Sequence, residues 1–270
     1  MTITGTAGTP SAPSGPFPPV LECRSVTAGY GDVQVLFGVD MFVERAEVVA
    51  LLGANGAGKT TLLRVLSGLE PLWGGEVRLN SQPIDAVPAF RRVGEGLCQI
   101  VGGESVAEGL TVGEHLRLWA TTVDRRNPLA AERMEEVFEV FPRLGERQSQ
   151  LASTLSGGEK QMLALSKALI VHPDLLVIDE FSLGLAPKVV GELLPVIRSI
   201  NQRGAAVLMV EQSVNVALSV ADRAYCMEKG RLVYEGSADE LRSQPDLLQS
   251  VYLEGVTAAL AQHTAAGGTP

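Results

Sequence analysis

Short apolar runs alternate with amphipathic segments along most of the chain. The runs predict strands buried on both faces, at residues 48–52, 175–179 and 205–210. The amphipathic segments predict helices at residues 58–67, 156–171 and 187–203. This alternation indicates an α/β fold with parallel strands at its centre.

Shorter β-rich segments flank the alternating region. They predict strands at 21–27 and 34–43 before it, a strand at 76–79 after its first helix, and a final pair at 224–227 and 232–234. The turn Glu228-Lys229-Gly230 joins the final pair, and we expect two short helical pieces between this pair and residue 255.

Between residues 99 and 155 the pattern becomes helical. Helices are predicted at 111–120 and 130–141, and the second has an apolar face opposite a row of glutamates. We interpret residues 99–155 as a helical subdomain inserted into the α/β core. Within it, His115 is expected on a polar helix face.

The two ends of the chain differ from the rest in composition. Residues 1–19 are mostly Thr, Gly, Ser, Ala and Pro and predict a disordered tail, and residues 255–270 predict a flexible one. One ordered domain is expected between them, over residues 20–254.

Composition narrows the class of protein. A net charge of −9 argues against nucleic acid as the main partner, because phosphate backbones bind clustered Lys and Arg. Three scattered cysteines predict buried thiols without a disulfide framework. There is no apolar run of 18 residues and no signal-peptide pattern, so we expect a soluble, cytoplasmic chain.

The segment after the first buried strand has the spacing G-x-x-x-x-G-K-[ST]. Its residues are Gly53, Ala54, Asn55, Gly56, Ala57, Gly58, Lys59 and Thr60, followed by Thr61. Glycines let successive N–H groups and a helix N-terminus point at one anion. Lys59 would contact β- and γ-phosphates, and the Thr60 hydroxyl would bind Mg²⁺. The alternative is a glycine-rich turn that binds nothing; the strand–loop–helix context favours a nucleoside-triphosphate site.

Two carboxylates follow the buried strand at 175–179. Asp179 and Glu180 would lie at its carboxyl end, where ligands bind in parallel sheets. Asp179 is placed to hold Mg²⁺, and Glu180 to polarise an attacking water. A surface acidic pair is the alternative when this segment is taken alone.

A second anion-binding pattern, LSGGEKQ at residues 155–161, begins a helix. A serine capping an ordinary helix would explain it in isolation. One P-loop with two such helix N-termini suggests that the second serves a neighbouring copy. The chain here resembles the ATP-binding subunits of ABC transporters, whose signature motif is LSGGQ, and the resemblance covers about residues 20 to 253.

The resemblance implies a P-loop ABC-type core: a mixed sheet flanked by helices, an N-terminal antiparallel β part and the helical insertion. ATP and Mg²⁺ are the implied ligands, with Ser156, Gly157 and Gly158 completing the ATP site of another chain. Tyr30 matches the residue that stacks on adenine. Gln99 matches a glutamine that senses metal and attacking water, although residues 100–109 form a longer loop than is usual in the family.

Residues 182–187 (SLGLAP) and 210–213 (VEQS) resemble the branched-chain amino-acid importer branch. The implied function is ATP hydrolysis that powers uptake of branched-chain amino acids or similar small polar solutes, such as amides or urea. The implied partners are a second ATPase subunit (the same or a related chain), transmembrane permease subunits and, indirectly, a solute-binding protein. The implied location is the cytoplasmic face of the membrane.

Two residues depart from the family pattern. Phe181 replaces a proline, and Gln212 replaces a histidine that contacts the γ-phosphate; glutamine can donate a hydrogen bond but cannot relay a proton. A low-activity subunit that relies on a catalytic partner therefore remains an alternative. A non-transport ABC switch and a P-loop small-molecule kinase are two others; the first would have tandem units or coiled-coil inserts, and the second would not need residues 155–161.

Overall fold

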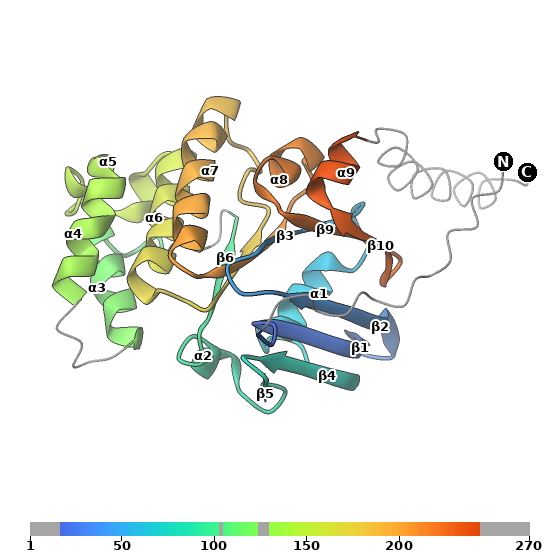
Figure 1. Cartoon of the computed structure of the whole chain (residues 1–270). Coiled ribbons are helices and arrows are strands. Elements are labelled where there is room, and N and C mark those ends of the chain that lie inside the picture. Colours follow the sequence, from blue (N-terminus) through green and yellow to red (C-terminus); the bar gives the residue numbers. More distant parts are fainter. Residues whose placement is uncertain (1–16, 103–104, 124–129, 244–270) are drawn as a thin grey trace, which may run out of the picture.

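The computed structural model describes residues 17–102, 105–123 and 130–243 (Figure 1). The predicted tails at 1–19 and 255–270 lie outside these ranges, except for residues 17–19. Any second helical piece between residue 244 and residue 255 also falls outside the described residues.

The described chain forms two sheets and a set of helices around them. The strands are β1 (Leu21–Tyr30), β2 (Val33–Val43), β3 (Val48–Leu52), β4 (Gly74–Leu79), β5 (Gln82–Pro83), β6 (Leu97–Val101), β7 (Leu175–Asp179), β8 (Ala206–Val210), β9 (Arg223–Glu228) and β10 (Arg231–Ser237). The helices are α1 (Lys59–Leu66), α2 (Ala89–Arg92), α3 (Val112–Val123), α4 (Ala130–Val140), α5 (Pro142–Gly145), α6 (Gly157–Val171), α7 (Pro187–Gln202), α8 (Val214–Val220) and α9 (Ala238–Ser243), with a 3-10 turn at Ala152–Thr154.

The larger sheet is mixed and has the order β10-β9-β3-β8-β7-β6. Its central pairs β9–β3, β3–β8, β8–β7 and β7–β6 are parallel, and β10 pairs with β9 antiparallel. The smaller sheet has the order β2-β1-β4-β5 and is antiparallel. The predicted fold class, a mixed sheet with an N-terminal antiparallel part, is confirmed.

Strand β3 lies between the two apolar cores of the molecule. Its alternate side chains point to opposite faces, as in any strand. Val48, Ala50 and Leu52 pack in a core with α3, α6, α7 and α8. Val49 and Leu51 pack in a second core with α1 and the antiparallel sheet. The five residues of β3 are fully buried, which explains the unbroken apolar run.

The predicted core elements are confirmed, and one edge of the sheet differs from the prediction. Strands β3 and β7 have the predicted ends, and α1, α6, α7 and β8 differ only at their termini. Strand β6 was not predicted, because its short run Leu-Cys-Gln-Ile-Val carries a polar residue at its centre and follows Gly96. It pairs with β7, so the helices α3–α5 begin only after this strand.

The prediction of an exposed His115 is wrong. Its side chain is buried, and Nε2 accepts a hydrogen bond from the backbone N–H of Ala107 at 2.9 Å. Because that nitrogen accepts, Nδ1 must carry the proton and donate to the carbonyl of Thr111, also at 2.9 Å. The histidine therefore fastens the preceding loop to α3.

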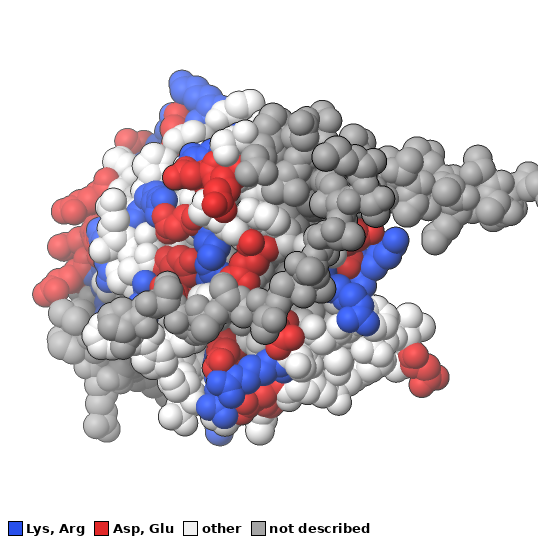
Figure 2. Space-filling model, turned by 45° about the vertical axis from the view of Figure 1, so that its right-hand side comes forward, with Lys and Arg blue, Asp and Glu red and all other residues white. Residues whose placement is uncertain are grey.

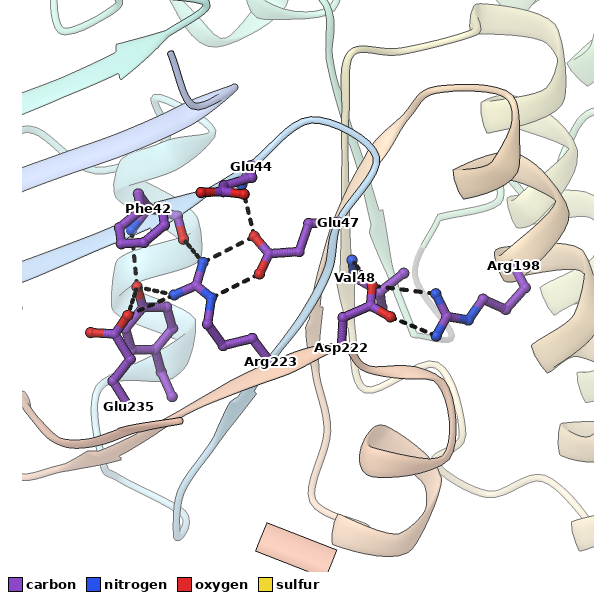
Figure 3. Close-up of polar contacts among 9 residues, drawn as sticks. Phe42, Glu44, Glu47, Val48, Arg198, Asp222, Arg223 and Glu235 are labelled. Carbon is purple, nitrogen blue, oxygen red and sulfur yellow. Dashed lines mark hydrogen bonds and ion pairs between the residues drawn. The ribbon is translucent and has the colours of Figure 1, made fainter. Parts of the chain in front are cut away.

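The start of β3 is held by a cluster of charged side chains (Figure 3). Arg223 makes a bidentate pair with Glu47, at 2.7 and 2.9 Å, and donates to Glu235 at 2.9 Å. Its guanidinium also lies 4.1 Å from the ring centroid of Phe42. Beside it, Asp222 accepts from the backbone N–H of Val48 at 2.8 Å and pairs with a residue of α7. The cluster joins β2, β3, β9 and β10.

None of the helices in the described ranges is long and apolar enough to cross a membrane. The three cysteines are buried and unpaired, as their scattered positions predict. Figure 2 shows acidic and basic side chains interspersed over one face of the molecule, with acidic ones gathered along one edge.

Candidate nucleotide-binding site

The loop between β3 and α1 needs glycine at specific positions. A Cβ on Gly53 would lie 2.4 Å from the carbonyl oxygen of Met227, so a larger residue would displace the loop. Gly58 caps α1 with φ 107°, a left-handed conformation that favours glycine. The backbone N–H of Gly230, in the turn between β9 and β10, donates to the carbonyl of Ala57 at 2.8 Å. The turn between β9 and β10 therefore holds the loop in place through this bond.

Lys59 lies at the first position of α1 and its side chain is buried. Its Nζ donates to the carbonyls of Gly53 at 2.7 Å and Ala54 at 3.1 Å, so the ammonium faces the interior of the loop. Burial lowers its pKa, while the negative charges of Glu180 and Asp179 act in the opposite direction. The loop thus holds a cation among backbone groups, next to two carboxylates.

The open side of the loop faces solvent. Asn55, Gly56 and Thr60 are exposed. Thr61 is buried, and its Oγ1 shares a hydrogen bond of 3.3 Å with the hydroxyl of Tyr30. Tyr30 is 42% exposed, so an aromatic face is available beside the N-terminus of α1.

The two predicted carboxylates lie at the carboxyl end of β7. Asp179 is buried, and Glu180 follows it with φ 48°, its backbone N–H bonded to the carbonyl of Val210 at 2.8 Å. The side chain of Gln212 donates through Nε2 to Oε1 of Glu180 at 2.9 Å. The structure therefore brings Lys59, Asp179, Glu180 and Gln212 to one end of the sheet.

The donors at this end suit Mg²⁺. Thr60 offers an exposed hydroxyl and Asp179 a carboxylate, both hard oxygen ligands. The described residues contain no group of three or more His, Cys, Asp or Glu side chains that would form a complete cage of protein ligands. A magnesium ion that accompanies a nucleotide needs only one or two carboxylates, because phosphates and water supply the rest. The residues present fit that arrangement.

Gln99 does not join this group. Its Oε1 accepts from the hydroxyl of Ser67, which caps the far end of α1, roughly 10 Å along the helix from Thr60. Directly after β6, the backbone N–H of Gly102 donates to the backbone carbonyl of Asp179 at 2.7 Å. The predicted roles of Gln99 in metal binding and catalysis therefore do not fit the structure. Gln99 lies too early in its strand.

The second anion-binding pattern has the geometry of an exposed helix N-terminus. Ser156 caps the 15-residue helix α6, and Ser156 and Gly157 are exposed. A capping box links Ser156 to Glu159, whose Oε2 accepts from both the backbone N–H, at 2.9 Å, and the hydroxyl, at 2.8 Å. A Cβ on Gly158 would lie 2.9 Å from a side-chain carbon of Val189, so this position favours glycine.

The two helix N-termini belong to opposite faces of the larger sheet. Helix α1 packs in the core with the antiparallel sheet, whereas α6 packs in the core with α3 and α7 (Figure 1). Residues 53–61 and 156–158 are therefore held by different layers, and each group includes exposed residues, namely Asn55, Gly56 and Thr60 in the first and Ser156 and Gly157 in the second.

One contributor to the site was not predicted, although it lies in the segment 210–213 that carries the family resemblance. Glu211 is buried between β8 and the segment that follows Glu180, and it accepts from the hydroxyl of Ser182 at 2.6 Å and from its backbone N–H at 3.1 Å. Burial raises the pKa of Glu211, although the hydrogen bonds from Ser182 oppose this shift. The carboxyl holds the chain just beyond Glu180. A sequence feature that could have indicated it is an acidic residue directly after the apolar run of β8.

Comparison with known proteins adds a family match. Residues 36–182 match the family model described as ABC transporter. The chain is 38% identical over 236 residues to the high-affinity branched-chain amino acid transport ATP-binding protein BraG of Pseudomonas aeruginosa, covering 87% of this chain and 100% of that protein. It is 34% identical to the probable branched-chain amino acid transport ATP-binding protein LivF of Archaeoglobus fulgidus, over 82% and 94% of the two chains. A solved ATP-binding subunit of an ABC transporter superposes with a TM-score of 0.76 at 30% identity, over 88% of this chain and 99% of that one.

Proposed function

This chain belongs to the ABC transporter ATP-binding family and is an ATP-binding subunit of such a transporter, and we propose that it powers solute uptake by hydrolysing ATP between two subunits. The observation that carries the proposal is that two helices on opposite faces of the larger sheet begin with glycine-containing patterns typical of anion binding, whereas the sequence has one P-loop. A second subunit, arranged head to tail, would bring its Ser156 end onto the triphosphate held at Lys59.

In the proposed cycle, the loop N–H groups and Lys59 bind the triphosphate, and the ring of Tyr30 packs on the adenine. Thr60 and Asp179 would hold Mg²⁺, which neutralises phosphate charge when bound. Glu180 accepts a proton from the attacking water. Gln212 keeps the carboxylate of Glu180 in place through its 2.9 Å hydrogen bond.

Closure of the dimer then depends on the γ-phosphate. While the triphosphate is intact, it is contacted by both subunits and favours the closed state; after hydrolysis, those contacts are lost. Permease subunits in the membrane would use this opening and closing, which places the chain at the cytoplasmic face. A solute-binding protein would act on the other side.

The proposed solutes are branched-chain amino acids or similar small polar molecules. Support comes from the names of the relatives in Pseudomonas and Archaeoglobus and from the segments 182–187 and 210–213. Deleting the gene should abolish uptake of radiolabelled leucine, isoleucine and valine while leaving sugar uptake intact. Unchanged uptake of all three amino acids would contradict this choice of solute.

The catalytic proposal is tested with Glu180→Gln. We expect turnover to fall by roughly a hundredfold or more, because the general base is lost, while ATP drives formation of a stable dimer. ATP turnover and sedimentation equilibrium measure the two effects. Glu192→Gln, an exposed change on α7, is the control and should leave both unchanged. Continued fast turnover in Glu180→Gln would overturn the assignment of the base.

A second candidate is a subunit that binds ATP while a related chain performs most of the hydrolysis. The observation that favours it is Gln212, which contacts Glu180 but cannot relay a proton. Turnover of the purified chain, alone and mixed with its partner ATPase, separates the two candidates. A low rate that only the partner restores would favour the second.

A further inference from the structure

The helix cap at Ser156 places a carboxylate directly beside the hydroxyl that would face a partner's phosphate. Ser156 is exposed, whereas Glu159 is 7% exposed and lies behind it. Oε2 of Glu159 accepts from the backbone N–H of Ser156 at 2.9 Å and from its hydroxyl at 2.8 Å. Oε1 pairs with Arg147 at 3.3 Å. The carboxylate is held on both sides.

In this arrangement the Ser156 hydroxyl, which a phosphate would need as a donor, already donates to Glu159. The Ser156 hydroxyl has a single proton, and it points at Glu159. To donate to a γ-phosphate oxygen, that proton must leave the carboxylate, which then keeps the backbone N–H and Arg147. A neutral amide at residue 159 could accept both bonds through its single oxygen, as Oε2 does now. Hydrogen bonds to a neutral oxygen are weaker than those to a carboxylate, so the amide would release the hydroxyl proton to a phosphate more readily.

The carboxylate also adds charge where an anion would bind. The hydrogen bond from the backbone of Ser156 lowers the pKa of Glu159 against the effect of burial, and the Arg147 charge lowers it further, so the group stays ionised. Arg147 offsets part of the negative charge, but its side chain is 41% exposed and partly screened by solvent. A triphosphate approaching Ser156 therefore meets a fixed negative charge.

We propose that Glu159 weakens the hold of the Ser156 end on the triphosphate of a second copy, and so sets the ATP concentration at which the dimer closes. The inference rests on the proposed head-to-tail dimer. Glu159 is a positioning residue, because it acts through the Ser156 hydroxyl and the local charge. It makes closure respond over a higher range of ATP concentration than an amide would.

The chain contains a matched control for this cap. At the start of α3, Oε2 of Glu114 accepts from the backbone N–H and the hydroxyl of Thr111, both at 2.8 Å. The backbone N–H of Glu114 donates to the Thr111 hydroxyl at 3.2 Å. Glu114→Gln therefore removes the same charge from the same kind of cap at a helix that plays no part in the proposed site.

The experiment measures ATP-dependent dimerisation of the full-length chain by sedimentation equilibrium in the Glu180→Gln background. Adding Glu159→Gln should lower the ATP concentration for half-maximal dimerisation by about three- to tenfold, the expected effect of removing one partly screened charge near a triphosphate. Adding Glu114→Gln should leave it within about twofold of the parent. An equal or higher ATP requirement in the Glu159→Gln variant overturns the inference.

A second readout separates this role from simple capping. Both substitutions weaken a helix cap, so both should lower the thermal midpoint slightly. Only Glu159→Gln should tighten closure while it lowers stability, a combination that a purely structural role would not produce. Failure of the Glu180→Gln parent to dimerise with ATP would instead contradict the proposed dimer, and would remove the basis of the inference with it.

Discussion

Arg223 is the central cation of the charged cluster around the start of β3. Its removal should destabilise the fold more than the removal of the carboxylate of Glu114, Glu159, Glu180 or Glu192. Arg223→Met keeps much of the apolar stem and deletes the charge. In the native structure Arg223 donates to Glu47, Glu235, Tyr225 and the carbonyl of Phe42. The side chains of Arg223, Glu47 and Glu235 are 15%, 14% and 17% exposed. After substitution, two carboxylates remain with little access to water.

The magnitude follows from that burial. Removing one partner of a buried ion pair costs about 3–5 kcal/mol, because the remaining charge is desolvated and unpaired. Burial alone would lower the pKa of Arg223. The hydrogen bonds to Glu47 and the electrostatic interactions with Tyr225 and Glu47 raise it above its ordinary range, so the guanidinium is charged at any pH of interest. For a chain of this size the loss corresponds to a fall of roughly 6–20 °C in the thermal midpoint.

Urea unfolding followed by circular dichroism and by fluorescence measures the free energy of unfolding. The control is Arg231→Met on the adjacent strand, where the guanidinium donates to the carbonyl of Phe37 at the surface, and it should cost less than about 1 kcal/mol. Adding Glu47→Gln to Arg223→Met should recover part of the loss, since one uncompensated charge disappears. A loss below about 1 kcal/mol in Arg223→Met, with an unchanged denaturant slope, would refute the reasoning.

Two further predictions concern the carboxyl end of β7. Gln212→Ala should lower kcat by about tenfold with ATP affinity within about twofold, because the 2.9 Å bond that orients Glu180 is lost; an unchanged kcat would show that Gln212 does not act through Glu180. Glu211 has a raised pKa in the folded state, so its protonated form is favoured there, and unfolding free energy falls as pH rises above 4.5, the ordinary value, through the folded pKa. Glu211→Gln should show a smaller fall over that window in urea titrations, and an identical pH dependence would contradict the assignment.

The parts of the fold that the sequence predicted are those with local causes. A five-residue apolar run bounded by turn residues needs no distant partner to be identified as a buried strand, and β3 and β7 were placed with their ends correct. The capping of α1 and α6 likewise depends on residues within one turn of each helix. The predicted sites at Lys59 and Asp179 depended on such local patterns.

The parts that could not be predicted depend on pairing between distant segments. Gln99 was assigned from the family resemblance, but its location along β6 is set by the register with β7, which no local pattern contains. His115 was expected on a polar helix face, but it is buried because the backbone of residues 107 and 111 bonds both of its ring nitrogens. Glu211 and Arg223 gain their roles from partners in segments that are distant along the chain.

Helix α6 has a mechanical consequence. Its N-terminus is the exposed Ser156, and near its other end Nζ of Lys167 donates to the backbone carbonyl of Gln99 at 3.3 Å. Fifteen helical residues form a rod about 22 Å long that does not bend easily. A force on the Ser156 end would tilt a rigid helix as a whole, and the bond from Lys167 would pass this tilt to β6 at the edge of the sheet. In the proposed head-to-tail dimer, α6 would connect the neighbouring subunit at Ser156 to the sheet edge at β6.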